Sequence, residues 1–279
     1  MVRIGLTIYN LDEYENTKYN NGIHQNISYI KKYFDSIPNI QTFFVSGAIK
    51  THKTAISIND VKTLKRLDFL IVIGSIPTES VIESLEEHVE LIWWVMGNSY
   101  VAETDEMLHT TLPTVIYKKS PKFKQVWISP HFEYSIDYYR YCFGRKNIEV
   151  CPYIWEPTYM GTPYVSNFNH NDINIGVFES NRHFNKSSFL PMIICEGAKD
   201  IINKAYIYNT EKFLPKSSFK DFADKSSLFK EKRMIFDQRI IFKDAMDNCC
   251  NVVVSFVENW DLNYLFLECF YLGIPLVHN

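Results

Sequence analysis

Short apolar runs alternate with amphipathic stretches along the first half of the chain. Residues 2–8 predict a strand, and Gly22 opens a stretch with apolar residues three or four positions apart, the spacing of one helix face. Residues 68–74 are almost continuously apolar, which is typical of a strand covered on both faces of a parallel sheet. The pattern predicts further strands at 41–46, 90–96, 125–129 and 148–151, and helices at 77–88 and 134–143. This alternation favours an α/β fold with crossover helices.

The alternation starts again after a segment that contains several prolines. Residues 152–171 hold three prolines with Asn, Thr and Gly, and are the predicted linker between domains at 1–151 and 172–279. The second domain is expected to have strands at 172–178, 204–208, 251–256 and 275–277, and helices at 187–195, within 227–246, and at 262–272. Its last strand begins just before Asn279, so we expect this domain to be incomplete at its C-terminus.

Composition narrows the class of protein. A hydrophobic fraction of 46% with 22% charged residues is that of a globular protein with a sizeable core. The 29 basic and 32 acidic residues carry no bias toward nucleic acid or an anionic membrane, so neither is an expected partner. We see no signal peptide and no apolar run that could span a bilayer, and expect a cytoplasmic protein.

The sequence does not contain the motifs that several kinds of chemistry require. The six cysteines form no C-x-x-C pair and are expected to be buried, reduced thiols, while the eight histidines are scattered and predict no metal site. Neither G-x-G-x-x-G nor G-x-x-x-x-G-K-[ST] occurs, which argues against a dinucleotide dehydrogenase and a P-loop nucleotidase.

The strongest candidate for chemistry is the segment 254–277. It predicts a strand, a loop, a helix and a Gly-Ile-Pro turn into another strand. The N–H groups at the start of such a helix can bind an anion, because the helix dipole places partial positive charge there. Glu268 lies among Leu and Phe within the helix, where a carboxylate is costly unless a partner such as a ribose diol bonds to it. Alternatively, Asp261 or Asn263 only caps the helix and Glu268 is solvated.

Two weaker candidates follow strands of the first half. Gly22 would let backbone N–H groups approach a ligand closely, although a plain turn explains it equally well. His131 stands just past a predicted strand, at the edge where open α/β sheets bind ligands. A lone histidine is also compatible with a purely structural role.

The chain's C-terminal end resembles a known signature. The run Glu-Asn-x-x-Leu-Asn-Tyr, followed by Glu268 and by Gly-x-Pro-Leu-Val-His-Asn, looks like the nucleotide-sugar signature of retaining glycosyltransferases of the GT-B fold. In detail it is similar to an uncharacterised bacterial and viral family related to those enzymes. In the broader signature an acidic residue precedes the second one by eight positions. Trp260 holds that place here, and Glu258 and Asp261 are out of register.

The resemblance implies two Rossmann-type domains and transfer of a sugar from a nucleoside-diphosphate sugar to an acceptor hydroxyl, with retention and without a metal or other cofactor. The donor would lie mainly on the second domain, and the acceptor, a glycan, protein or lipid-linked molecule, on the first. The site would lie in the cleft between them.

The resemblance also implies residue roles. Arg182 and Lys186 would hold the diphosphate, with Asn181 in the same loop, although a basic surface loop is the alternative. Asn263 and Tyr264 would bind phosphate or sugar, and Glu268 the ribose. Gly22 would lie near the donor phosphates and His131 against the transferred sugar, which makes His131 and Glu268 the candidate catalytic residues. The other loop acids that could contact an acceptor are Glu103, Asp105 and Glu133.

Two other function classes remain open at this point. A non-catalytic nucleotide-sugar-binding or scaffold module would keep the fold without the chemistry, and Trp260 in place of the first acid favours it. A two-domain receptor for a small ligand is disfavoured by the missing signal peptide.

Overall fold

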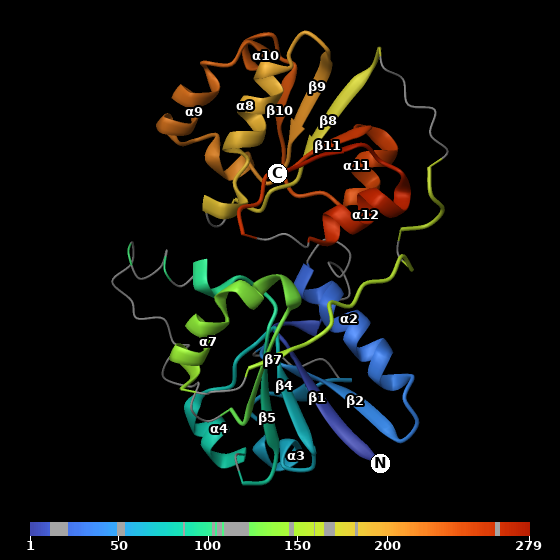
Figure 1. The fold of residues 1–279 in the computed structure, drawn as a ribbon, viewed down its shortest axis with the longest axis vertical. Coiled ribbons are helices and arrows are strands. Elements are labelled where there is room, and N and C mark those ends of the chain that lie inside the picture. Colours follow the sequence, from blue (N-terminus) through green and yellow to red (C-terminus); the bar gives the residue numbers. More distant parts are fainter. Residues whose placement is uncertain are drawn as a thin grey trace. The chain divides into compact units, whose positions relative to one another are not determined.

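The chain forms two compact units, Met1–Glu156 and Pro157–Asn279, each built on a parallel sheet with packed helices (Figure 1). The computed structural model describes residues 1–11, 22–48, 54–85, 87–101, 104, 108, 123–144, 148–158, 160–164, 171–181, 184–259 and 263–279. The predicted α/β class with two parallel sheets of Rossmann type is confirmed.

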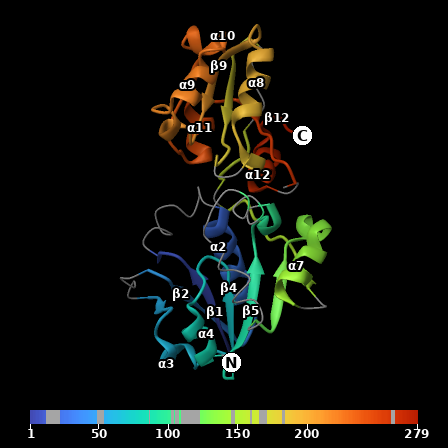
Figure 2. The same cartoon turned by 90° about the vertical axis from the view of Figure 1, so that its left-hand side faces the viewer.

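The first unit has a seven-stranded sheet in the order β3-β2-β1-β4-β5-β6-β7. Its elements are β1 (Val2–Ile8), α2 (Gly22–Asp35), β2 (Ile40–Ser46), β3 (Ile56–Ser57), α3 (Val61–Leu64), β4 (Phe69–Val72), α4 (Glu79–Leu85), β5 (Glu90–Val95), β6 (Gln125–Ile128), the 3-10 helix η2 (Pro130–Ser135), α7 (Ile136–Phe143) and β7 (Glu149–Val150). Strands β2, β1, β4 and β5 lie side by side in that order in Figure 2.

Apolar side chains cover both faces of this sheet. On one face, Ile27 and Ile30 of α2 pack into a cluster with alternate residues of β1, among them Leu6 and Ile8. The other face carries Gly5, where an added Cβ would lie only 2.7 Å from the Leu67 side chain. Burial on both faces explains the continuous apolar runs of the central strands.

The second unit has a five-stranded parallel sheet in the order β10-β9-β8-β11-β12. Its elements are β8 (Ile173–Val177), η3 (Phe184–Lys186), α8 (Phe189–Gly197), β9 (Ile202–Ile207), η4 (Glu211–Phe213), α9 (Ser217–Ala223), α10 (Ser227–Lys230), β10 (Met234–Phe236), α11 (Phe242–Asn248), β11 (Val252–Val254), α12 (Tyr264–Leu272) and β12 (Leu276–Val277). In Figure 1, α8 and α9 lie on one side of the strands and α11 and α12 on the other.

Each side of this sheet has its own apolar packing. Met192 and Cys195 of α8 join the cluster that contains Val177 and Ile207. On the other side, the Phe178 ring stacks on Tyr208 and meets the edge of Phe242 from α11, with centroid distances of 4.9 and 5.2 Å. The two sides together bury the central strands.

Two parts of the second unit differ from the sequence prediction. The stretch 210–227, for which the sequence predicted no element, contains α9, whose Phe219 is buried in the core. The stretch 227–246, expected to hold one helix, contains α10, the edge strand β10 and α11. Strand β10 has three residues and forms through its pairing with β9, so its local pattern was too short to predict.

Candidate functional site

The strand order of the second unit identifies its ligand-binding edge. The connection from β8 leads to β9 on one side, and β11 pairs with β8 on the other, so the winding direction changes between β8 and β11. Open α/β sheets bind ligands outside the carboxyl ends of the strands at such a point. The loops that leave β8 and β11 therefore form the candidate site.

A buried carboxylate joins these two loops. Glu179, two residues after β8, is only 2% exposed. Its Oε1 accepts hydrogen bonds from Ser255 Oγ at 2.6 Å and from the Phe256 N–H at 3.3 Å, both just past β11. Burial raises the pKa of Glu179 to about 7, against the lowering effect of the Ser255 bond, the Lys186 charge and the Phe256 bond.

Lys186 supplies the opposite charge. It ends η3, and the N–H of Asn181 donates to its carbonyl oxygen at 2.9 Å, which closes the loop between the two residues. Burial lowers the pKa of the Lys186 ammonium to about 8, while the charge of Glu179 raises it. The predicted diphosphate-binding cation thus lies in the electrostatic field of a carboxylate that the sequence did not single out.

Asparagines organise the loop after β8. Asn181 adopts a left-handed backbone conformation with φ of 54°, and its Oδ1 accepts the Ser188 N–H at 2.8 Å at the start of α8. Its Nδ2 donates to the Glu179 carbonyl oxygen at 3.0 Å. Asn185 connects the loop to the one after β11, because its carbonyl accepts the Glu258 N–H at 2.9 Å and its Nδ2 donates to the Glu258 carbonyl at 3.3 Å. The two predicted donor-binding loops are therefore brought together.

The start of α12 belongs to the second of these loops. Asn263 is the N-cap, and its Oδ1 accepts the Leu265 N–H at 3.4 Å. Tyr264 begins the helix and is buried, and Glu268 is also buried at 4% exposure. Asn263 therefore does cap the helix, as one alternative held, but the idea of a solvated Glu268 is wrong. A ligand-binding role for any of the three stays a prediction.

The end of β12 supports the same loop. Asn279 pairs through its side-chain amide with the backbone of Val257, accepting from its N–H and donating to its carbonyl, both at 3.1 Å. The His278 ring lies against Phe266 of α12 with centroids 4.8 Å apart. These contacts hold the loop after β11 against the adjacent strand and helix.

The first unit contains the other candidates. Gly22 is the exposed first residue of α2, and a Cβ added there would meet no atom of the described residues within 4 Å. His131 lies in η2, just past β6, where its ring packs against Phe132 and the edge of Tyr153, with centroids 4.0 and 5.2 Å away. Glu133 lies exposed in the same 3-10 helix. Their roles toward a ligand stay predictions.

Some predicted residues lie outside the described part of the chain: Arg182, Trp260, Asp261, Glu103 and Asp105. Among the residues that the structure describes, no group of three His, Cys, Asp or Glu side chains could hold a metal ion. Within those same ranges, none of the helices combines the length and apolar character needed to cross a bilayer.

Sequence reasoning missed Glu179, Ser255 and Asn279. A charged residue directly after an apolar strand was a usable signal for Glu179, since strand ends form the ligand-binding edge. Ser255 gave no comparable signal, because only the pairing of β8 with β11 places it beside Glu179.

Solved structures of glycosyltransferases match the fold of the chain, which has two parallel sheets with packed helices. HepE of Anabaena in complex with UDP is 12% identical, with a TM-score of 0.59 over 100% of this chain and 80% of that one. The O-GlcNAc transferase of Thermobaculum terrenum is 10% identical, with a TM-score of 0.58 over 99% and 52%. A glycosyltransferase from Rickettsia africae is 10% identical, with a TM-score of 0.54 over 99% and 79%.

These TM-scores over nearly the whole chain establish the fold that the chain shares with those enzymes. The chain belongs to the family described as "Protein of unknown function (DUF2827)", whose model matches residues 4–279. No curated protein sequence matches the chain. The resemblance noted in the sequence is thereby confirmed at the level of the fold and of an uncharacterised family.

Proposed function

We propose that this protein is a glycosyltransferase that moves a sugar from a nucleoside-diphosphate sugar to an acceptor hydroxyl. The observation that carries the proposal is the meeting of the β8 and β11 loops at the switch point of the second sheet, with Lys186 in one and the start of α12 after the other. The similar fold of HepE, solved with UDP and with UDP and glucose, supports a nucleotide-sugar donor.

The leaving group explains why a lysine suits this position. Negative charge builds up on the β-phosphate as the glycosidic bond breaks, and a fixed ammonium stabilises that charge. Lys186 would do this, helped by N–H groups at the start of α12 near Asn263 and Tyr264. We therefore propose metal-independent transfer, and we propose retention from the sequence resemblance.

Glu268 would recognise the ribose. A carboxylate buried in an apolar helix favours hydroxyl donors, and a ribose diol offers two of them. His131 would contact the transferred sugar, and the loop at Gly22 would lie near the donor phosphates. The acceptor, which we place on the first unit, would be a glycan, a protein or a lipid-linked molecule.

Calorimetric titration with UDP and other nucleoside diphosphates tests the donor site. We expect Lys186→Ala to weaken binding by about 1.5–3 kcal/mol, the range for a hydrogen bond to a charged group. Lys225→Ala, at an exposed position of the same unit, is the matched control and should bind like the wild type. An unchanged affinity in Lys186→Ala would remove Lys186 from the site.

A second comparison tests the ribose contact. Glu268→Gln should weaken the binding of UDP more than that of pyrophosphate, because only UDP carries a ribose. Equal losses for the two ligands would argue against the contact.

The rival proposal is a non-catalytic binding module, which Trp260 in place of the first acidic residue favours. Turnover assays over a panel of nucleotide sugars separate the two. Slow donor hydrolysis that depends on Lys186 supports the enzyme, whereas binding without turnover on every donor supports the module. Absence of nucleotide binding would defeat both.

A further inference from the structure

We propose that Asn181 is a positioning residue, whose side chain fixes the loop that ends at Lys186 and makes no contact of its own with the donor diphosphate. The inference rests on the proposed function for the identity of the ligand. The resemblance in the sequence groups Asn181 with the residues that would hold the diphosphate. Its hydrogen bonds assign it a different task.

The polar atoms of the Asn181 side chain are engaged within the protein. Its Oδ1 accepts the Ser188 N–H at 2.8 Å, and because a backbone N–H only donates, this bond fixes which end of the amide is the oxygen. Its Nδ2 donates to the Ser188 hydroxyl oxygen at 2.9 Å and to the Glu179 carbonyl oxygen at 3.0 Å. An amide nitrogen carries two hydrogens, so neither remains for a phosphate oxygen.

These bonds join the two ends of the loop. Glu179 lies just past β8 and Ser188 directly precedes α8, and each is only 2% exposed. The backbone N–H of Asn181 donates to the Lys186 carbonyl oxygen at 2.9 Å. The backbone of Asn181 thus closes the loop onto Lys186, and its side chain attaches the closed loop to the neighbouring strand end and helix start.

The point of attachment is itself fixed from the adjacent strand. Asn209 follows β9, and its Nδ2 donates to the carbonyl oxygens of Phe178 and Glu179, both at 3.1 Å. The Glu179 carbonyl therefore accepts from two asparagine side chains, which uses both of its lone pairs. Moving Asn181 away from this position would break several hydrogen bonds together, so the contacts favour one conformation of the loop.

The backbone of Asn181 allows the side chain to be tested by itself. Its φ of 54° lies in the left-handed region, which asparagine and especially glycine adopt readily. Asn181→Gly therefore keeps the backbone conformation and removes only the side-chain bonds. A loop that is held in its binding conformation before the ligand arrives avoids the loss of affinity that ordering would cause.

A double-mutant cycle on UDP affinity, measured by calorimetry, tests the proposal. We expect Asn181→Gly to weaken UDP binding about tenfold, which corresponds to a fall of the binding-competent loop to about one tenth of its population. In the Lys186→Ala background, the same substitution should change the affinity by less than about twofold, because no lysine side chain is left to position. Equal losses in the two backgrounds would mean that Asn181 acts on the ligand independently of Lys186 and would overturn the proposal.

Two further variants guard this cycle. Asn39→Gly is the matched control, since Asn39 is an exposed residue of the first unit with φ of 66°, and its UDP affinity should equal that of the wild type. Ser188→Ala is the milder perturbation if Asn181→Gly fails to fold in circular dichroism melting. It removes one acceptor of the Asn181 amide, and the Ser188 hydroxyl makes no capping bond to α8. Its expected loss of about twofold to threefold should likewise disappear in Lys186→Ala.

Hydrogen exchange measured by NMR tests the loop without a nucleotide. The amide of residue 181 donates to the Lys186 carbonyl, and neither Asn181→Gly nor Ser188→Ala removes this donor or this acceptor. If the side chain holds the loop closed, the protection factor of this amide should fall about tenfold in Asn181→Gly, after correction for the intrinsic rate of glycine. An unchanged protection factor would overturn the proposal.

The two measurements distinguish this inference from the proposed function. Reduced protection of the residue 181 amide, in a wild type that binds no nucleoside diphosphate, would keep the loop-fixing role and defeat the proposed function. UDP binding that requires Lys186, together with an unchanged protection factor or with equal losses in both backgrounds, would support the proposed function and defeat the positioning role of Asn181.

Discussion

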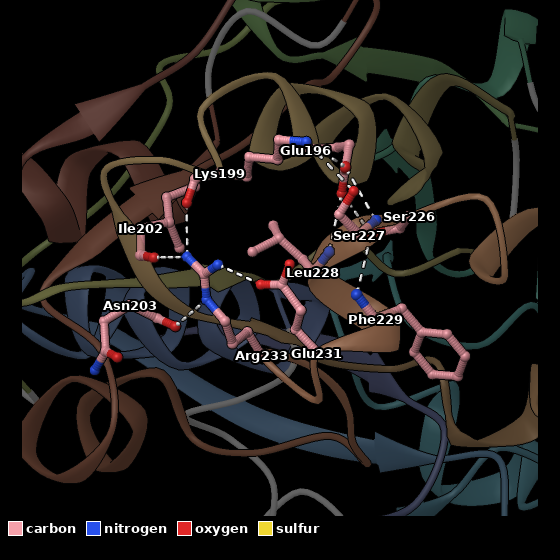
Figure 3. Close-up of polar contacts among 10 residues, drawn as sticks. All are labelled: Glu196, Lys199, Ile202, Asn203, Ser226, Ser227, Leu228, Phe229, Glu231 and Arg233. Carbon is pink, nitrogen blue, oxygen red and sulfur yellow. Dashed lines mark hydrogen bonds and ion pairs between the residues drawn. The ribbon is translucent and has the colours of Figure 1, made fainter.

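The carboxylate of Glu196 is expected to contribute measurably to the stability of the second unit. It extends from α8 to the start of α10, where it accepts hydrogen bonds from Ser226 Oγ at 2.6 Å, Ser227 N–H at 3.0 Å and Leu228 N–H at 3.2 Å (Figure 3). Burial alone would raise its pKa, but these donors together lower the pKa to about 2 from an ordinary value of 4.5. The perturbation we consider is Glu196→Gln, which removes the charge and keeps one acceptor.

The expected loss of stability follows from the pKa shift of Glu196. Each pKa unit corresponds to about 1.4 kcal/mol, so the shift from 4.5 to about 2 corresponds to about 3.5 kcal/mol at most. The side chain is 28% exposed, so solvent screening reduces this figure, and the glutamine oxygen still accepts one bond. We expect Glu196→Gln to lower the free energy of unfolding by about 1–2 kcal/mol at pH 7.

Urea unfolding followed by circular dichroism measures this loss. Because the folded-state pKa is depressed, the stabilisation is fully present above the unfolded pKa of 4.5 and disappears as pH falls toward about 2. The difference between wild type and Glu196→Gln should therefore shrink as pH falls from about 5 to about 2. The matched control is Glu231→Gln, whose carboxylate pairs with Arg233 at 2.7 Å but is 54% exposed. We expect it to cost less than about 0.5 kcal/mol.

Two results would refute this reasoning. Equal losses for Glu196→Gln and Glu231→Gln would mean that the bonds to the start of α10 are worth no more than a surface ion pair. A loss of unfolding free energy in Glu196→Gln that stays constant from pH 7 to pH 2 would mean that the charge of the carboxylate does not stabilise the second unit.

Three further substitutions test contacts inside the units, Arg233 and Gly273 in the second and Leu70 in the first. Arg233→Lys should cost about 1–3 kcal/mol in urea unfolding, because the guanidinium donates to three backbone carbonyls, including that of Lys199 at 2.6 Å, and a lysine lacks this fork (Figure 3). Gly273→Ala should lower the melting temperature in calorimetry by an amount equivalent to about 1 kcal/mol, since Gly273 ends α12 with φ of 73°. Leu70→Ala should cost about 2–5 kcal/mol because Leu70 is fully buried in β4, and a loss below 1 kcal/mol would contradict the described core.

Local patterns were sufficient for the principal elements. The apolar runs of β1, β4 and β5 and the helical spacing of α2 predicted these elements to within a few residues, because a strand or helix buried in a parallel sheet needs a distinctive periodicity. The edge strands β3 and β10, of two and three residues, were not predicted from their local pattern. They form because an adjacent strand offers unpaired backbone groups.

By itself, the sequence determined the α/β class, the loop that carries Lys186, and the helix that carries Glu268, because periodicity and strand ends are local features. Only the tertiary structure decided that β8 lies beside β11, since strand order is set by contacts between distant parts of the chain. That pairing brings Ser255 to Glu179 across 76 positions, and the carboxylate of Glu179 is buried there. Burial then changes the proton affinity of Glu179 and of Lys186, an effect that depends on their surroundings in space rather than on their neighbours in sequence.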